Sequence, residues 1–255
     1  MRMRAYVLHL LRAEARRANA RHLLRHCGVA GEIWPAVDGS ALPPDELQAH
    51  YDTDLFDPHY PFTLRTGEIG CFLSHRQIWA DMQHRAEGCA LIIEDDAGID
   101  EGILSHSLHL AKKHIQTLGV IQLQTRPLPK GPSQLIDQSG PCQLVVPQVT
   151  GLRTTAQVVS KWAAAQLLDR SALFDRPVDT FIQSHWHTGI RPAAIARSGV
   201  LEIADRLDGS TIQTAPKPLW EKLWREVARG RYRLAMHRAA RHSDAPASGG
   251  RQSHD

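Results

Sequence analysis

The segment Ala90-Leu-Ile-Ile-Glu-Asp-Asp96 joins four apolar residues to three consecutive carboxylates. A short apolar run bounded by polar residues is typical of a strand buried inside a sheet. In open α/β sheets, ligands bind beyond the carboxyl ends of the strands. The segment therefore predicts a buried strand with a polar site at its end.

Strands and helices alternate on both sides of this segment. The patterns predict strands near residues 4–10, 32–37, 119–123, 144–149 and 156–159, and helices over residues 12–26, 68–86, 104–118 and 161–170. Residues 126–141 are rich in Pro and Gly and predict a loop. The alternation predicts an α/β fold with a mostly parallel sheet and helices on both faces.

The composition narrows the class of protein. The chain has 255 residues, 42% of them hydrophobic and 22% charged, which excludes disordered, fibrous and disulfide-scaffold proteins. The four cysteines show no C-x-x-C spacing and no secretory signal precedes them, so we expect reduced thiols in a cytoplasmic protein. No apolar run approaches the roughly 20 residues that span a bilayer. Any contact with a membrane is expected to be peripheral.

The charge is unevenly distributed along the chain. Residues 217–255 hold nine Lys and Arg against four Asp and Glu, a net charge of +5 that leaves −2 of the total +3 for the preceding residues. We therefore expect an enzyme-like domain over residues 1–216 and a basic helical arm over residues 217–242. The tail over residues 243–255, rich in Ser, Gly and Ala, is expected to be disordered.

The arm combines apolar and basic residues. Trp220, Leu223, Trp224 and Val227 share one helical face. This face would either bind an anionic membrane surface or dock on the domain, and the pattern favours neither. No recognition motif supports binding to nucleic acid.

The three carboxylates repel one another, and a hard divalent cation such as Mn²⁺ or Mg²⁺ relieves this repulsion and can bridge to a diphosphate. Side chains alternate along an extended chain, so Glu94 and Asp96 would face one side and Asp95 the other. The alternative is a solvated acidic turn, or a cap for a following helix.

A second motif is Thr66-Gly-Glu-Ile-Gly-Cys-Phe-Leu-Ser-His75. Its glycines permit close approach of the backbone, and a helix N-terminus favours anionic groups. Ser74 and His75 would lie two turns into the helix, away from its apolar stripe. A plain helix start with a packed histidine explains the same residues.

Three blocks in this order resemble glycosyltransferase family 25: residues 67–75, residues 91–96 and Pro177-Val-Asp179. The opening strand, the Arg-rich residues 12–17 and Ala36-Val-Asp-Gly39 are similar to the same family. The resemblance implies a GT-A-like, Rossmann-like fold, a UDP-sugar donor, most commonly UDP-galactose, a divalent metal and inversion at the anomeric carbon.

The resemblance also suggests roles for individual residues. Asp96 is the first candidate for a metal ligand, with Glu94 as the second. The candidates for donor binding are Arg16, Arg17, Asp38, Ser74 and Asp95. For Arg16 and Arg17, a solvated helix face explains the residues equally well. Asp179 is the candidate catalytic base, with orientation of the acceptor or helix capping as its alternatives, and Glu68 and His75 are reserve bases.

His185-Trp-His187 follows these blocks without an identifiable third metal ligand. Trp186 is the candidate for stacking on an acceptor sugar, and a packed Trp is the plainer explanation.

Taken with this resemblance, the sequence predicts a cytoplasmic, metal-dependent inverting glycosyltransferase, which would be peripheral at the inner face of the cytoplasmic membrane if its basic arm binds the membrane. It would move galactose from UDP-galactose to a lipooligosaccharide or other surface glycan. The rival hypotheses are a metal-dependent phosphoryl-transfer or phosphohydrolase enzyme, and a catalytically inactive, membrane-associated sugar-binding protein.

Overall fold

The computed structural model describes residues 2–204 and 219–246, with side chains from residue 224 onward in the second range. The strands are β1 (Met3–His9), β2 (Gly31–Pro35), β3 (Cys89–Glu94), β4 (Ala97–Ile99), β5 (Val120–Leu123), β6 (Ser133–Ser139), β7 (Cys142–Pro147), β8 (Ala156–Ser160), β9 (Ala193–Ala196) and β10 (Val200–Glu202). The helices are α1 (Glu14–His26), α2 (Pro44–His50), α3 (Thr66–His84), α4 (Glu101–Leu118), α5 (Lys161–Arg170), α6 (Val178–Gln183), α7 (His185–Thr188) and α8 (Leu219–Arg241).

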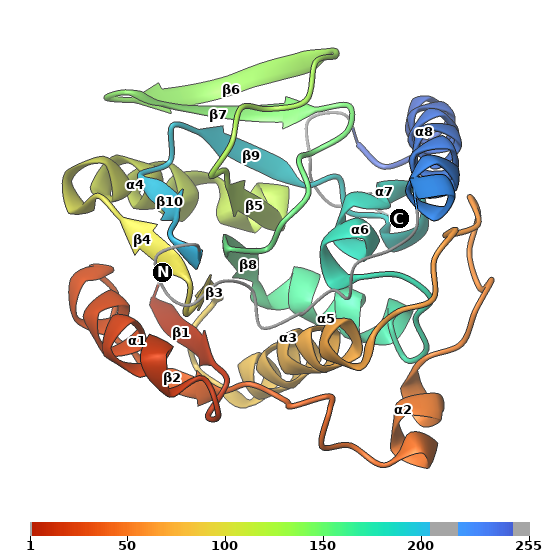
Figure 1. Ribbon diagram of the computed structural model, residues 1–255. Coiled ribbons are helices and arrows are strands. Elements are labelled where there is room, and N and C mark those ends of the chain that lie inside the picture. Colours follow the sequence, from red (N-terminus) through yellow and green to blue (C-terminus); the bar gives the residue numbers. More distant parts are fainter. Residues whose placement is uncertain (1, 205–218, 247–255) are drawn as a thin grey trace.

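Eight strands form the main sheet in the order β2-β1-β3-β8-β5-β9-β7-β6, and β4 pairs separately with β10 (Figure 1). The pairings β2–β1, β1–β3 and β5–β9 are parallel, and the remaining pairings of the main sheet are antiparallel. Six of the eight strands therefore point in one direction, and β8 and β7 run against them. The predicted α/β class is confirmed, with a sheet that is mixed at β8 and at the β7–β6 edge.

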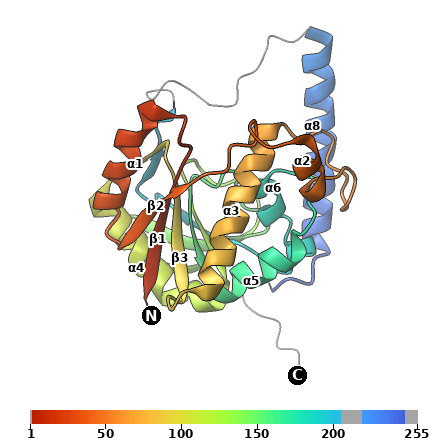
Figure 2. The same cartoon turned by 90° about the horizontal axis from the view of Figure 1, so that it is seen from below.

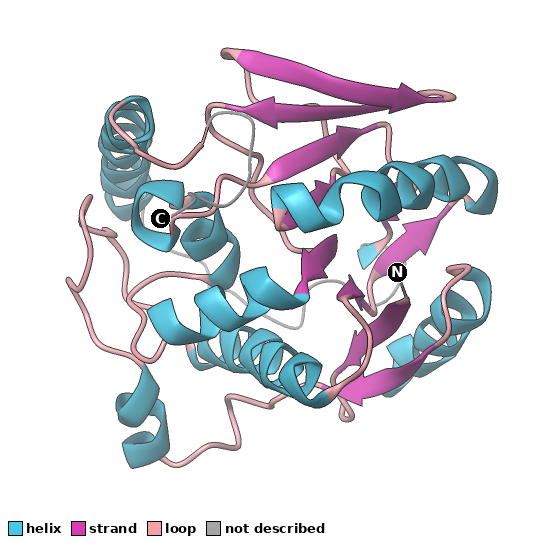
Figure 3. Ribbon diagram, turned by 180° about the vertical axis from the view of Figure 1, so that it is seen from behind, coloured by secondary structure: helices cyan, strands magenta, loops and turns pink. Residues whose placement is uncertain are grey.

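Helices cover both faces of the sheet (Figures 2 and 3). Along β1, Ala5 and Val7 pack with α1 and α4, whereas Tyr6 and Leu8 pack with α3, α5 and α6. This alternation is the two-residue period of a strand with helices on both faces. β3 is buried along Cys89–Ile93, as its apolar sequence predicts.

The predicted loop over residues 126–141 is wrong in its second half, where β6 lies. β6 is the edge strand of the sheet and pairs only with β7 among the described strands. Its side chains are largely exposed, and Leu135 keeps 56% of its surface accessible. An exposed edge strand needs no buried apolar face, so its sequence lacks the alternation that marks a strand.

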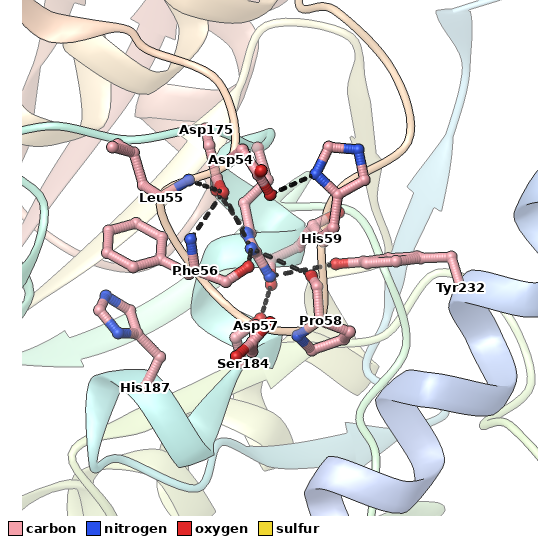
Figure 4. Close-up of polar contacts among 12 residues, drawn as sticks. Asp54, Leu55, Phe56, Asp57, Pro58, His59, Asp175, Ser184, His187 and Tyr232 are labelled. Carbon is pink, nitrogen blue, oxygen red and sulfur yellow. Dashed lines mark hydrogen bonds and ion pairs between the residues drawn. The ribbon is translucent and has the colours of Figure 1, made fainter.

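A buried ion pair fixes the loop before α3 and the start of α6. The guanidinium of Arg176 is fully buried and donates to the carboxylate of Asp175 and to the carbonyl oxygen of Phe56. Asp175 also accepts hydrogen bonds from the backbone N–H groups of Leu55 and Phe56, each at 3.0 Å (Figure 4). The hydroxyl of Tyr232 in α8 lies 3.3 Å from the same guanidinium. One ion pair therefore links three segments that are distant in sequence.

The helix α8 docks one face on the domain. Met236 and Ala240 are buried, whereas Trp224, Val227 and Leu234 are exposed. The side chains of Trp220 and Leu223, which complete the predicted apolar face, lie outside the described residues. None of the described helices is both long enough and apolar enough to cross a membrane.

The residues after α8 continue the contact with the domain. The hydroxyl of Ser243 lies 2.7 Å from Nδ1 of His185, and Arg191 donates to the carbonyl oxygen of Ala245. Burial lowers the pKa of His185 to about 4, so the imidazole is neutral at pH 7. The first residues of the predicted tail, 243–246, are thus held against the domain, and residues 247–255 lie outside the described part.

A close backbone approach sets the position of α3. A Cβ atom added at Gly70 would lie 2.6 Å from the carbonyl oxygen of Val37 and 2.6 Å from the backbone nitrogen of Gly39. We expect Gly70→Ala to lower the free energy of unfolding by about 1–3 kcal/mol through this clash, although Ala is the better helix former. Chemical denaturation measures the change.

Gly230→Ala is the matched control, because Gly230 also lies within a helix and an added Cβ would meet no atom within 4 Å. It should raise the free energy of unfolding by about 0.5–1 kcal/mol. Equal gains for both variants would contradict the close approach.

Candidate active site

The carboxylates at the end of β3 are held by residues of β1 and α1. The Asp95 carboxylate is buried between Nδ1 of His9 at 2.7 Å and the Arg16 guanidinium at 3.2 Å. The same guanidinium nitrogen lies 3.2 Å from Asp96. Asn19 donates to the backbone carbonyl oxygens of Asp95 and Ala97. The strand end is thus tied to α1 by hydrogen bonds and by one buried cation.

Glu94 and Asp96 line a cavity of about 230 Å³, as alternation along the strand predicts, whereas Asp95 does not. Three further carboxylates, from separate parts of the chain, line the same cavity: Glu68, Asp179 and Glu202. We call it the acidic cavity. The structure therefore brings the proposed metal ligands and two of the candidate bases to one place.

The electrostatics of the acidic cavity separate Asp96 from Glu94. Burial and the neighbouring Glu94 raise the pKa of Asp96 to about 6. Burial also acts to raise the pKa of Glu94, but His75 and the hydroxyl of Thr154, at 2.7 Å, outweigh it and lower that pKa. Of these two carboxylates, Asp96 is therefore the one whose burial is not offset by its hydrogen-bond and charge partners.

Asp179 lies in the first turn of α6 and is oriented by three hydrogen bonds. Its Oδ1 accepts from the backbone N–H and the hydroxyl of Thr180, and its Oδ2 accepts from the backbone N–H of Arg153 at 3.0 Å. Burial raises the pKa of Asp179 despite these bonds. A carboxylate with a raised pKa is better suited to accepting a proton near neutral pH.

The two reserve bases are more constrained. Glu68 accepts a hydrogen bond from the backbone N–H of Arg65 and caps the start of α3. His75 is fully buried, with Nδ1 at 3.3 Å from the amide nitrogen of Gln157 and Nε2 at 3.8 Å from Glu94. Glu68 lines the acidic cavity and His75 does not.

The remaining predicted residues lie elsewhere. The hydroxyl of Ser74 is buried and joins the backbone N–H of Val37 to the carbonyl oxygen of Gly70. Asp38 accepts a hydrogen bond from the hydroxyl of Ser40 and pairs with Arg12 at 2.6 Å, and these two contacts lower the pKa of Asp38. Arg17 is exposed on α1. Trp186 donates to the carbonyl oxygen of Asp57 and does not line the acidic cavity.

The lining of the acidic cavity includes Cys71, Thr154 and Glu202, which were not among the sequence-based candidates. Cys71 lies one helical turn before His75, the buried reserve base, and the ligand atoms of Cys71, His75 and Glu94 lie within 4.8 Å of one another. The i, i+4 spacing of Cys71 and His75 was the available signal. No such signal marks Thr154, which lies in a loop, or Glu202, which ends the three-residue strand β10.

A Rossmann-like α/β protein with converging carboxylates at the end of a buried strand is the class that the fold and site define. The model for "Glycosyltransferase family 25 (LPS biosynthesis protein)" matches residues 3–130, half of the chain. The chain belongs to glycosyltransferase family 25. The predicted resemblance is confirmed, and membership supports a sugar-transferase function.

Three relatives illustrate the range of the family. The chain is 35% identical over 96 residues to a "Glycosyltransferase 25 family member" of Drosophila melanogaster, and 37% identical over 94 residues to "Procollagen galactosyltransferase 1" of Danio rerio. It is 36% identical over 95 residues to "Inactive glycosyltransferase 25 family member 3" of Mus musculus. Each match covers 36% of this chain and 16% of the relative, so the chain spans a small part of each.

The buried cation at the strand end gives a test of the site's electrostatics. Arg16→Met leaves Asp95 and Asp96 without their shared cation, and we expect a loss of about 3–5 kcal/mol in unfolding free energy near neutral pH. The loss should shrink at about pH 5, because the raised pKa of Asp96, about 6, then leaves that carboxyl mostly protonated. Urea denaturation at both pH values measures it.

Arg17→Met is the control, since Arg17 is the next residue on α1 and is exposed. It should change the free energy of unfolding by less than about 0.5 kcal/mol at either pH. A loss for Arg16→Met that is independent of pH would contradict the proposed coupling to Asp96.

Proposed function

We propose that the chain is a metal-dependent, inverting glycosyltransferase that uses a UDP-hexose donor, with UDP-galactose as the first candidate, and a glycolipid or oligosaccharide acceptor. The main support is the convergence of Glu94, Asp96 and Asp179 on one cavity. Two carboxylates suited to a cation and a third suited to a proton are the groups that such a transfer requires.

The residues present fit a divalent cation of the Mn²⁺ or Mg²⁺ type. Glu94 and Asp96 offer carboxylate oxygens, which these ions prefer. Burial and the negative charge of Glu94 raise the pKa of Asp96, and a bound cation would offset both effects. When bound, the ion would neutralise charge on the diphosphate of the leaving group. Arg16 does not line the acidic cavity, and it would position both Asp95 and Asp96 through its contacts at 3.2 Å.

In the proposed step, the acceptor hydroxyl oxygen forms a bond to the anomeric carbon from the face opposite UDP. The bond between that carbon and the UDP oxygen breaks, and UDP leaves with the electron pair. Asp179 accepts the hydroxyl proton, and its hydrogen bonds to Arg153 and Thr180 hold the carboxylate in a fixed orientation. Glu68 is the reserve base in the same cavity.

The proposed location of the reaction follows from the exposed apolar and basic side chains of α8. We place the reaction on the cytoplasmic side of the membrane, with a surface-glycan precursor as acceptor. The exposed Trp224 and Val227 and the basic side chains of α8 support a peripheral contact with an anionic membrane surface through residues 217–242.

The metal ligands can be tested without an acceptor. Asp96→Asn should reduce Mn²⁺-dependent binding of UDP-galactose by at least about tenfold, because it removes one anionic ligand. Isothermal titration calorimetry with and without Mn²⁺ measures this, together with a panel of other UDP-sugars.

Asp100→Asn is the matched control. Asp100 is an exposed carboxylate four residues further along, and it caps α4 by accepting from the backbone N–H of Ile103 at 3.0 Å. Asn caps a helix as well as Asp does, so the fold and the binding of donor should be unchanged. Absence of metal-dependent binding for every UDP-sugar would overturn the proposed function.

The assignment of the base has its own test. Asp179→Asn should lower kcat by about 10²–10⁴-fold while leaving the affinity for UDP-sugar near that of the wild type. The readout is sugar transfer, or slow hydrolysis of the UDP-sugar where no acceptor is supplied. Turnover within a few-fold of the wild type would move the role to Glu68, for which Glu68→Gln is the corresponding variant.

Product analysis separates the rival hypotheses. Release of phosphate without sugar transfer would favour a phosphohydrolase, which can use the same carboxylates. Binding of a UDP-sugar without turnover would favour an inactive sugar-binding protein, a state for which the family has a named precedent in the mouse relative.

A further inference from the structure

A second cavity, of about 530 Å³, lies between the domain and α8. We call it the arginine cavity, because its lining includes four arginines and one histidine: Arg126, Arg153, Arg229, Arg233 and His237. Among the described residues no Asp or Glu lines it. Its charge is therefore opposite to that of the acidic cavity.

The two cavities meet at the candidate base. Arg153 lines both, and its backbone N–H donates to Oδ2 of Asp179 at 3.0 Å. Asp179 lines the acidic cavity, and the next residue, Thr180, lines the arginine cavity. A ligand in the arginine cavity would thus lie beside the group that is proposed to take a proton from the acceptor.

The positive charge of the arginine cavity is only partly neutralised. Arg126 and Arg153 share the single carboxylate of Glu202, at 3.0 Å and 2.7 Å. Arg229 pairs with the exposed Glu226. Arg233 has no carboxylate partner among the residues that the structure describes. Guanidinium groups with free donors bind phosphate and carboxylate in a two-pronged manner.

Other groups of the lining suit a sugar. Tyr60 and Phe62 both line the arginine cavity, and their rings meet edge to face with centroids 5.7 Å apart. The guanidinium of Arg229 lies 5.7 Å from the centroid of Phe62, so aromatic and cationic groups lie side by side in this lining. The Thr150 hydroxyl lies in the same lining and is buried without a hydrogen-bond partner among the described residues. A buried hydroxyl without a partner costs free energy, which a ligand could recover.

We propose that the arginine cavity binds the acceptor, and that the acceptor is an anionic glycan with a phosphate or carboxylate close to the hydroxyl that is glycosylated. The inference rests on the proposed function. The donor diphosphate belongs beside Glu94 and Asp96, which line only the acidic cavity, so the arginine cavity remains for the acceptor.

The test compares glucose 6-phosphate with glucose, which differ only in the phosphate, on the full chain in the presence of UDP and Mn²⁺. Ligand-observed NMR or calorimetry should show at least about tenfold tighter binding of glucose 6-phosphate, because its phosphate pairs with guanidinium groups. Glucuronic acid should show the same preference through its carboxylate. The double variant Arg229→Ala/Arg233→Ala should lose most of the difference.

Arg238→Ala is the control, because Arg238 is exposed on the same helix and does not line the arginine cavity. It should retain the preference for glucose 6-phosphate. Circular dichroism establishes that α8 is intact in each variant.

Three results would overturn the inference. Equal binding of glucose 6-phosphate and glucose would show that the acceptor site does not select an anionic group. A preference that survives the double variant would place the anionic ligand outside the arginine cavity. If the double variant instead lost UDP binding, the arginine cavity would hold the donor diphosphate. Each result is distinct from failure of the proposed function, which is absence of metal-dependent UDP-sugar binding in the wild-type chain.

Discussion

The crowding of three carboxylates at the end of β3 is the constraint on which the site depends. Asp95 is buried, and it is tolerated there because His9 and Arg16 contact both of its oxygens. These partners come from β1 and α1, so neutralising the charge also fixes the parallel β1–β3 pair against α1. Burial and the neighbouring Glu94 raise the pKa of Asp96, and its share of the same guanidinium does not offset them.

A second buried ion pair positions the other side of the site. Asp175 and Arg176 immediately precede α6, and their hydrogen bonds go to backbone groups of the loop before α3 and to Tyr232 of α8. A buried guanidinium is stable only when its donors are satisfied, and here Asp175 and backbone carbonyl oxygens accept from them. The consequence reaches Asp179, three residues after Arg176, because the orientation of α6 is set at its first residues.

The sequence was informative where burial imposes a pattern. The apolar run of β3 and the apolar spacing in α3 were found because both elements are buried in the core, and two of the three family blocks lie on these elements. The third block lies at the start of α6. The strands β6 and β10 were not predicted from the sequence. β6 is largely exposed and β10 has three residues, so neither has a buried face long enough to show a two-residue period. The contact of Asp38 with Arg12 and that of Trp186 with the carbonyl oxygen of Asp57 were not predicted either. A sequence specifies neighbours along the chain, and not the partners that loops bring together.

The distribution of charge takes on a different meaning in three dimensions. Along the chain, the domain is slightly acidic and residues 217–255 carry +5. In the fold, Arg229 and Arg233 of α8 join Arg126 and Arg153 of the domain around one cavity, next to a cavity with five carboxylates. Part of the charge of the arm is therefore directed at a ligand-sized space rather than at a flat surface. Adjacent cavities of opposite charge favour ligands of opposite charge. Under the function that we propose, the acidic cavity would take the metal-bound donor and the arginine cavity the anionic acceptor, with Asp179 at the boundary between them.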